Sequence, residues 1–132
     1  MSTSCLICLG SNYHREENFM LAHRQLDALF PDIHFAKVQE TQPIGLQNPA
    51  VFLNQLGCFC TDMSMEKVIE VLKSIEREAG RKPEDKAIER VCLDIDLLTY
   101  GECVLKPEDL KRDYIVEGLS EFCKQSDKKN RI

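Results

Sequence analysis

Two aspartates, Asp94 and Asp96, interrupt an otherwise apolar run that reads Leu93-Asp94-Ile95-Asp96-Leu97-Leu98. If this run is a β-strand, the i, i+2 spacing places both carboxylates on one face, roughly 7 Å apart at their Cα atoms. Two like charges on a partly buried face are costly unless a cation joins them or one carboxyl is protonated. Mg²⁺ prefers oxygen ligands and commonly bridges carboxylates to substrate phosphates. The pair therefore predicts a magnesium site, and the alternative is an exposed strand face that carries two aspartates by chance.

A cluster of basic residues precedes this pair and comprises Arg81, Lys82, Lys86 and Arg90. Cationic loops commonly close over phosphates, but interleaved acidic residues leave a solvated, salt-bridged loop as the alternative. The sequence has no Gly-Lys-Ser/Thr phosphate loop, which excludes a P-loop kinase. Gly10-Ser11 and Asp94 are more than eighty positions apart. This separation argues against nucleotidyltransferases, in which a Gly-Ser and an Asp-x-Asp lie close together in sequence.

A single amide, Asn54, lies in a second apolar run and shares a strand face with Phe52. A buried amide needs hydrogen-bond partners, and its donors and acceptor suit the edge of a heterocycle. Phe52 and Tyr114 could sandwich a flat ring, although a simple core role explains these aromatics equally well. Gly10-Ser11-Asn12 follows an apolar strand and permits close approach of a ligand, or forms an ordinary turn.

The elements that must position these residues alternate short strands with amphipathic helices. We expect strands over 4–9, 33–41, 51–61 and 90–100. We expect helices over 15–30, from a cap at Ser64 to Gly80, and from Pro107 to near Phe122. The order β-α-β-β-α-β predicts an α+β, ferredoxin-like fold, with an antiparallel sheet, helices on one face and an additional C-terminal helix. The fold alone decides no activity.

The composition favours one globular domain. The chain has 132 residues, 43% apolar and 30% charged, and carries a net charge of −5, which argues against a nucleic-acid partner. No apolar run is long enough to span a membrane, and the N-terminus lacks a signal-peptide pattern. We expect a cytoplasmic monomer whose seven cysteines are reduced and structural. A single domain over 1–122 and a basic, disordered tail over 123–132 are expected.

The residues together resemble the 6-hydroxymethyl-7,8-dihydropterin pyrophosphokinase family over most of residues 5–122. The matching pieces occur in the family's order: Gly10-Ser11-Asn12, Thr41-Gln42-Pro43-Ile44-Gly45, Phe52-Leu53-Asn54, Ile75-Glu76, Gly80-Arg81, Leu93 to Gly101, and Lys111-Arg112-Asp113-Tyr114. Each piece is weakly specific by itself. Their order and spacing together are fairly specific.

The resemblance implies transfer of pyrophosphate from ATP to the pterin hydroxymethyl group in folate biosynthesis, with ATP and the pterin as the small-molecule partners. It implies that Asp94 and Asp96 hold two Mg²⁺ ions and act catalytically together with Arg81 and Arg90. The implied pterin-binding residues are Thr41, Pro43, Ile44, Gly45, Asn54 and the stacking pair Phe52 and Tyr114. The implied ATP-binding residues are Glu76, Lys86, Leu97 and Arg112.

The sequence departs from the family pattern just before the acidic strand. The family usually reads Arg-Trp-Gly-Pro-Arg-Thr-x-Asp-x-Asp there, whereas this chain reads Ala87-Ile88-Glu89-Arg90-Val91-Cys92-Leu93-Asp94. The Trp, Gly and Pro are missing and Arg90 is one position out of register. A Pro-His before the late arginine is replaced by Pro107-Glu108, in a shortened segment. Two alternatives therefore stay open: a relative that binds pterin or nucleotide without turnover, and a ferredoxin-like interaction domain.

Overall fold

The computed structural model describes residues 2–41, 50–80 and 82–130. Within them, six strands form one antiparallel sheet in the order β2-β4-β1-β5-β6, and β3 also pairs with β4. The strands are β1 (Thr3–Ser11), β2 (His34–Phe35), β3 (Gln39–Thr41), β4 (Phe52–Thr61), β5 (Asp94–Tyr100) and β6 (Cys103–Val104). The α+β, ferredoxin-like prediction is confirmed.

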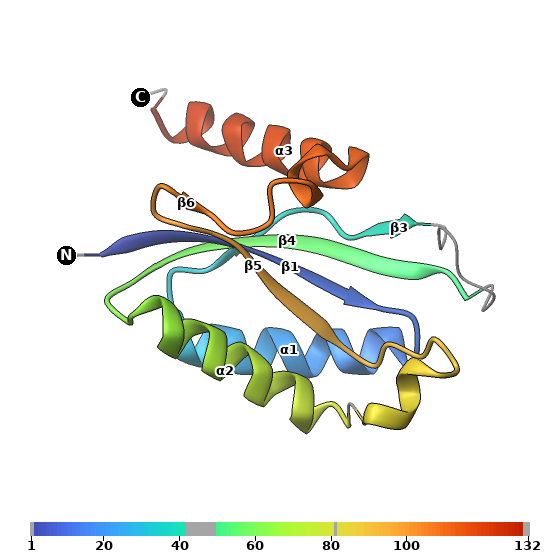
Figure 1. Ribbon diagram of the computed structural model, residues 1–132. Coiled ribbons are helices and arrows are strands. Elements are labelled where there is room, and N and C mark those ends of the chain that lie inside the picture. Colours follow the sequence, from blue (N-terminus) through green and yellow to red (C-terminus); the bar gives the residue numbers. More distant parts are fainter. Residues whose placement is uncertain (1, 42–49, 81, 131–132) are drawn as a thin grey trace.

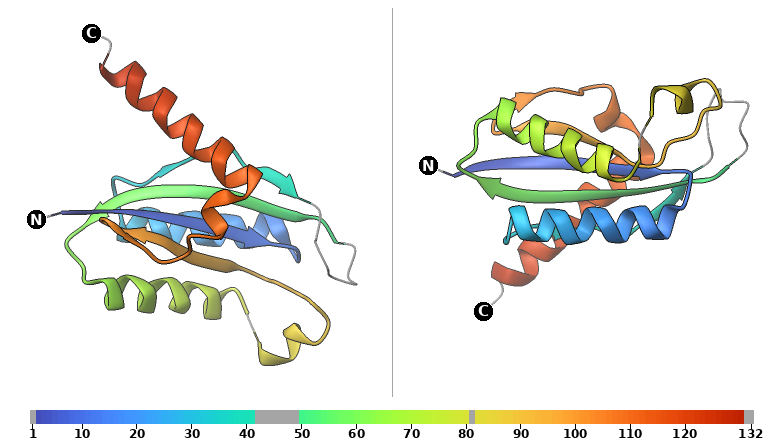
Figure 2. Two further views of the ribbon diagram at one scale, coloured as in Figure 1. Left: turned by 45° about the horizontal axis from the view of Figure 1, so that its top comes forward. Right: turned by 90° about the horizontal axis from the view of Figure 1, so that it is seen from below.

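The helices cover both faces of the sheet. They are α1 (Arg15–Leu29), α2 (Met65–Glu78) and α3 (Asp113–Asn130), with two 3₁₀ turns, η1 (Pro83–Lys86) and η2 (Asp109–Lys111). Helices α1 and α2 lie on one face and α3 crosses the other (Figure 1). Seen from below, α1 and α2 stand in front of the sheet and α3 behind it (Figure 2).

The central strand β1 explains this three-layer arrangement. Cys5, Ile7 and Leu9 pack into the core beneath α1 and α2. Leu6 and Cys8, which alternate with them, pack into a second core beneath α3. Because successive strand residues point to opposite faces, a strand that is buried on both sides is apolar throughout. The continuous run Cys5 to Leu9 is therefore the sequence signature of a strand between two helical layers.

The same alternation sorts the polar residues of β4 and β5. Ile95 and Leu97 belong to the core on the α1/α2 side, whereas Leu98 belongs to the core on the α3 side. Asp94 and Asp96 are therefore on the α3 face, as is Asn54, two positions before Leu56. The pleat thus brings the predicted metal ligands and the predicted pterin amide to one side of the sheet.

Helix α3 lies close to the sheet because it carries a glycine at the contact. A Cβ atom at Gly118 would come within 2.5 Å of the Leu56 Cδ1 atom, a distance that no side chain tolerates. Ile115, one turn earlier, is 1% exposed. These contacts fix the first turn of α3, and with it Tyr114, over β1 and β4.

Several predicted boundaries differ from the observed ones. The expected strand 33–41 is divided into β2 and β3, because the chain between them packs Ala36 into the core and bonds its amide to the Leu56 carbonyl. The third helix does not begin at Pro107. Arg112 has extended backbone (φ −69°, ψ 143°), so η2 ends before α3 starts. Helix α3 also continues beyond Phe122, to Asn130.

The division into a domain over 1–122 and a tail over 123–132 stays a prediction. None of the helices in the described part of the chain combines the length and the apolar character that crossing a bilayer requires.

Candidate active site

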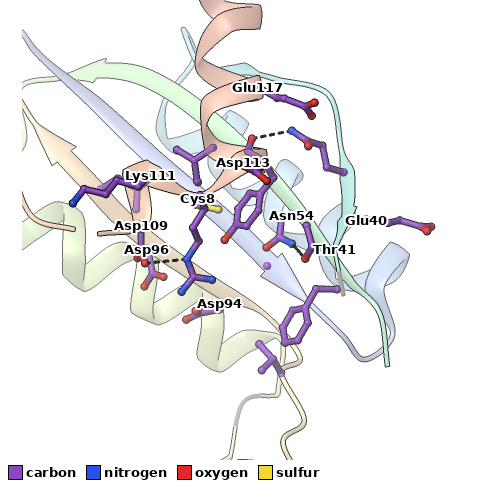
Figure 3. A pocket seen from close by; sticks show the side chains of 18 residues that line it. Cys8, Glu40, Thr41, Asn54, Asp94, Asp96, Asp109, Lys111, Asp113 and Glu117 are labelled. Carbon is purple, nitrogen blue, oxygen red and sulfur yellow. Dashed lines mark hydrogen bonds and ion pairs between the residues drawn. The ribbon is translucent and has the colours of Figure 1, made fainter. Parts of the chain in front are cut away.

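A cavity of about 970 Å³ opens between the α3 face of the sheet and the start of α3. This volume is in the range of sites that hold a nucleotide-sized or drug-sized ligand. The cavity is lined by residues of β1, β3, β4, β5, η2 and α3 (Figure 3). It brings together seven predicted site residues that are far apart in sequence: Thr41, Phe52, Asn54, Asp94, Asp96, Arg112 and Tyr114.

The acidic pair lies on one side of this cavity (Figure 3). Burial, together with the charge of Asp94 and against the opposing charge of Lys106, raises the pKa of Asp96 from its ordinary 3.8 to about 6. A buried carboxyl group beside a second carboxylate forms a site that a divalent cation would stabilise. Among the described residues, no group of three or more His, Cys, Asp or Glu side chains is arranged to hold a metal. A two-carboxylate site suits Mg²⁺, which takes its remaining oxygens from water and phosphate.

Cys8 lies beneath the acidic pair, opposite Asp96 in the β1–β5 register. Burial raises the pKa of its thiol to about 12, and the charges of Asp96 and Asp94 act in the same direction. The thiol therefore stays protonated and contributes packing at the floor of the cavity. A nucleophilic cysteine needs the opposite shift.

The other side of the cavity carries the amide and the aromatic rings. Asn54 is 7% exposed, and its Nδ2 donates a hydrogen bond to the Thr41 hydroxyl. Gly10 of β1 is paired with Asn54 of β4, and a Cβ atom added at Gly10 would lie 3.3 Å from the Asn54 Oδ1 atom. Gly10 is therefore needed less for a turn than to leave room for this amide.

Tyr114 is held in this part of the cavity from the neighbouring strand. The Gln39 side chain of β3 donates a hydrogen bond of 2.9 Å to the Tyr114 carbonyl, which ties β3 to the start of α3. Phe52 and Tyr114 both line the cavity, as the prediction of two ring-stacking residues requires. The structure therefore combines a hydrogen-bonding edge with two aromatic surfaces.

Arg112 gives the cavity a cation. Its Nε atom lies 3.4 Å from an Asp109 carboxylate oxygen, and Lys111 also lines the cavity. Sequence reasoning missed Asp109, Gln39 and Cys8. For Asp109 a signal existed, because it lies three positions before Arg112 on one helical turn.

The cavity thus combines an acidic pair, an amide edge with two aromatics, and an arginine. A family model described as 7,8-dihydro-6-hydroxymethylpterin-pyrophosphokinase (HPPK) matches residues 6–124. The chain belongs to this family. The predicted family is confirmed, and with it the pyrophosphokinase class of enzyme.

Curated relatives agree with the HPPK assignment. Three bacterial proteins named 2-amino-4-hydroxy-6-hydroxymethyldihydropteridine pyrophosphokinase resemble the chain. The Bacillus subtilis protein is 26% identical over 97% of this chain and 83% of its own length. The Haemophilus influenzae protein is 28% identical over 88% and 79%. The Aquifex aeolicus protein is 30% identical over 86% and 76%.

Other residues to which the HPPK resemblance gave a role lie outside the cavity. Glu76 of α2 is 6% exposed, and its carboxylate accepts a hydrogen bond of 2.8 Å from the Ile95 amide. Leu97 packs in the core on the α1/α2 side, because it alternates with Asp96. The side chain of Glu76 therefore anchors β5, and that of Leu97 stabilises the core. Their contact with ATP stays a prediction that these side-chain positions do not support.

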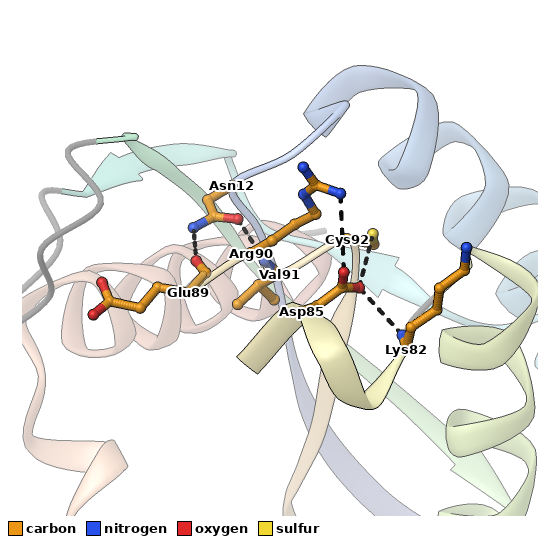
Figure 4. Close-up of polar contacts among 7 residues, drawn as sticks. All are labelled: Asn12, Lys82, Asp85, Glu89, Arg90, Val91 and Cys92. Atoms are coloured by element: carbon orange, nitrogen blue, oxygen red, sulfur yellow. Dashed lines mark hydrogen bonds and ion pairs between the residues drawn. The ribbon is translucent and has the colours of Figure 1, made fainter. Parts of the chain in front are cut away.

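The two described basic residues of the segment 82–92 that were predicted to act at the site, Arg90 and Lys86, also lie away from the cavity. The Arg90 guanidinium lies 4.1 Å from the Tyr13 ring centroid. It also lies 3.9 Å from the Asp85 carboxylate (Figure 4). Lys86 is exposed in η1 and does not line the cavity. Pro43, Ile44, Gly45 and Arg81 lie outside the described residues, so their predicted roles are not tested.

The Gly10-Ser11-Asn12 element has a structural role that the sequence did not indicate. The Asn12 side chain donates to the Glu89 carbonyl at 2.8 Å and accepts from the Val91 amide at 2.6 Å (Figure 4). The Ser11 hydroxyl donates to the Cys92 carbonyl at 2.7 Å. The end of β1 therefore holds the chain where it enters β5 and fixes the position from which Asp94 follows.

Proposed function

We propose that this chain transfers the pyrophosphoryl group of Mg-ATP to the hydroxymethyl group of 6-hydroxymethyl-7,8-dihydropterin, in folate biosynthesis. The family assignment supports this reaction. The observation that carries it is that one cavity is lined by Asp94 and Asp96 together with Asn54 and Arg112. An acidic pair for the cation, an edge for the heterocycle and an arginine for phosphate are the three parts that this transfer needs.

The chain's own residues divide the two substrates between them. Asn54 and Thr41 bind the polar edge of the pterin, and the rings of Phe52 and Tyr114 stack on its faces. Arg112 binds phosphate oxygens of ATP, because a guanidinium matches two such oxygens at once. Asp94 and Asp96 would hold Mg²⁺, expected as two ions, which would supply positive charge to neutralise the triphosphate.

The transfer itself joins the pterin hydroxymethyl oxygen to the β-phosphorus of ATP. The bond between the β-phosphorus and the α–β bridging oxygen breaks, and AMP leaves with that oxygen. The hydroxymethyl proton is released to solvent. Little covalent chemistry is asked of the protein, so the rate depends on the positioning of both substrates and on the electrostatics of the cavity.

The assay is AMP formation from Mg-ATP and 6-hydroxymethyl-7,8-dihydropterin by the full chain. We expect AMP only when ATP, pterin and Mg²⁺ are all present. A folded chain that binds the pterin and forms no AMP would instead be the relative without turnover. A chain whose melting temperature responds to neither substrate would be an interaction domain.

We also propose that the protein acts as a cytoplasmic monomer. Cys5, Cys8 and Cys92 are buried thiols, which suits a reducing compartment. Light scattering of the purified chain with and without Mg-ATP measures the mass directly, and a dimer mass would contradict the monomer.

A further inference from the structure

Asp109 of η2 is a carboxylate to which neither the sequence pattern nor the proposed reaction assigns a role. Its side chain is 29% exposed and lines the same cavity as Asp94 and Asp96 (Figure 3). One of its oxygens lies 3.4 Å from the Arg112 Nε atom. The cavity therefore holds a carboxylate that is paired with the arginine proposed to bind ATP.

The neighbouring pair on the same turn shows what an ordinary surface contact is like here. Glu108 and Lys111 also have i, i+3 spacing and lie 3.5 Å apart, but their side chains are 85% and 74% exposed. Ion pairs that are this exposed contribute little. The Asp109–Arg112 pair is less exposed, at 29% and 55%, and both of its side chains line the cavity, where a bound nucleotide would exclude water and strengthen the interaction.

Asp109 does not complete a metal site. Within the described residues, Asp94, Asp96 and Asp109 do not converge as a group of three metal-ligating side chains. Asp109 instead forms an ion pair with the Arg112 guanidinium. Its carboxylate is therefore directed at the cation of the cavity.

The guanidinium has a second neighbour in the Tyr114 phenol. Burial raises the pKa of Tyr114, whereas the Arg112 charge and a hydrogen bond between the two side chains lower it. A guanidinium has five N–H donors in a rigid plane. If Nε–H is directed at Asp109 and another donor at Tyr114, the remaining donors can bind phosphate oxygens.

We propose that Asp109 is a positioning residue that orients the Arg112 guanidinium toward the phosphates of ATP, with the Tyr114 hydroxyl as its second support. This rests on the proposed function of the cavity. Holding the planar group from one side reduces the freedom that it loses when phosphate binds. The Tyr114 ring stacks on the pterin while its hydroxyl contacts Arg112, so one side chain serves both substrates.

The test compares KM for ATP with KM for the pterin in Asp109→Ala. We expect KM for ATP to rise about threefold to tenfold, as loss of a partly exposed charge-assisted contact implies. KM for the pterin and the melting temperature should stay close to those of the wild type. Asp109→Asn keeps a hydrogen-bond acceptor of the same shape and should recover at least half of the loss. Tyr114→Phe keeps the ring and should raise KM for ATP alone.

Glu108→Ala is the matched control, because it removes the exposed carboxylate one position earlier on the same turn. It should leave both KM values unchanged. An unchanged or lower KM for ATP in Asp109→Ala would overturn the proposal, because it would mean that Asp109 restrains Arg112 or does nothing. A rise confined to the Mg²⁺ concentration for half-maximal rate would overturn it in favour of a metal ligand.

Failure of the proposed function gives a different result. A wild-type chain that binds Mg-ATP in calorimetry without forming AMP contradicts the reaction alone. The Kd of a non-hydrolysable ATP analogue with Mg²⁺, compared between wild type and Asp109→Ala, then tests the positioning of Arg112 without turnover. Equal Kd values would contradict the role of Asp109, and a weaker Kd in Asp109→Ala would support it.

Discussion

Two segments bring arginines close to the acidic strand, and the fold uses them differently. In 82–92, Arg90 turns toward Asp85 and the Tyr13 ring, away from the cavity. In 106–112, Arg112 pairs with Asp109 and lines the cavity. Both arginines have an aspartate and an aromatic neighbour, so the type of contact does not distinguish them.

Burial of the aspartate does distinguish them. Asp85 is 7% exposed and also accepts hydrogen bonds from the Lys82 amide at 3.2 Å and the Cys92 thiol at 3.8 Å. Its charge is therefore used to shape the segment that leads into β5. Asp109 has no comparable set of backbone partners among the contacts of the described residues and faces the ligand space. Arg90 therefore stabilises the conformation of its own segment, whereas Arg112 is available to bind a ligand in the cavity.

The two arginines differ in function only if Asp94 and Asp96 are the centre of the site. We expect Asp94→Asn and Asp96→Asn each to lower the rate of AMP formation at least about 100-fold, because each removes one of the two carboxylates proposed to hold Mg²⁺. Glu102→Gln, which alters an exposed carboxylate in the turn after β5, is the matched control and should keep the wild-type rate. A rate within threefold of wild type for both variants would place the metal elsewhere.

The direct test of the two segments is a pair of alanine variants. Arg112→Ala should lower kcat/KM for ATP about tenfold to a hundredfold, since a charge-assisted phosphate contact is worth about 1.5–3 kcal/mol. Arg90→Ala should change kcat/KM less than threefold, because its guanidinium is not at the cavity. It should instead lower the melting temperature, through the loss of its contacts with Asp85 and Tyr13. The reverse ranking of the two kcat/KM values would show that segment 82–92 moves onto ATP.

The contacts that stabilise segment 82–92 can be removed by substituting Asp85. Asp85→Ala leaves the Lys82 amide and the Arg90 guanidinium without their acceptor, so we expect the free energy of unfolding to fall by about 1–3 kcal/mol. Urea unfolding followed by circular dichroism measures this change. Glu84→Ala, on the exposed side of the same 3₁₀ turn, should change it by less than about 0.5 kcal/mol. Equal free energies of unfolding for Asp85→Ala and Glu84→Ala would contradict the stabilising role of Asp85.

The sequence predicted the parts of the site that depend on strand alternation. Asp94, Asp96, Asn54 and Phe52 were assigned to faces by the period of two, and the pleat brings these faces together in one cavity. The order of strands and helices likewise predicted the sheet, because β-α-β-β-α-β leaves few topologies.

The parts that the sequence did not predict depend on contacts between distant residues. Arg90 is placed by Tyr13 and Asp85, and Leu97 is placed by the core on the other face of β5. Asn12 was considered as part of a ligand loop, yet its side chain bonds the chain at Glu89 and Val91. Periodicity carries no information on such pairs, because a loop's conformation is decided by which distant polar groups satisfy its backbone.

The smallest expected effect is on the pH dependence of the melting temperature. It tests the acidic pair of the cavity in the absence of substrate. The pKa of Asp96 is raised from 3.8 to about 6, so the folded metal-free protein binds more protons than the unfolded chain between these values. The Asp96 contribution to stability is therefore favourable at pH 4 and is lost as pH rises through about 6. If Mg²⁺ binds the ionised pair, as proposed, it should raise the melting temperature more at pH 7.5 than at pH 5. Asp96→Asn removes this titration. In this variant, Mg²⁺ should therefore raise the melting temperature only slightly, and by the same amount at pH 5 and pH 7.5. If Mg²⁺ raised the melting temperature of the wild type as much at pH 5 as at pH 7.5, the cation would bind away from Asp96.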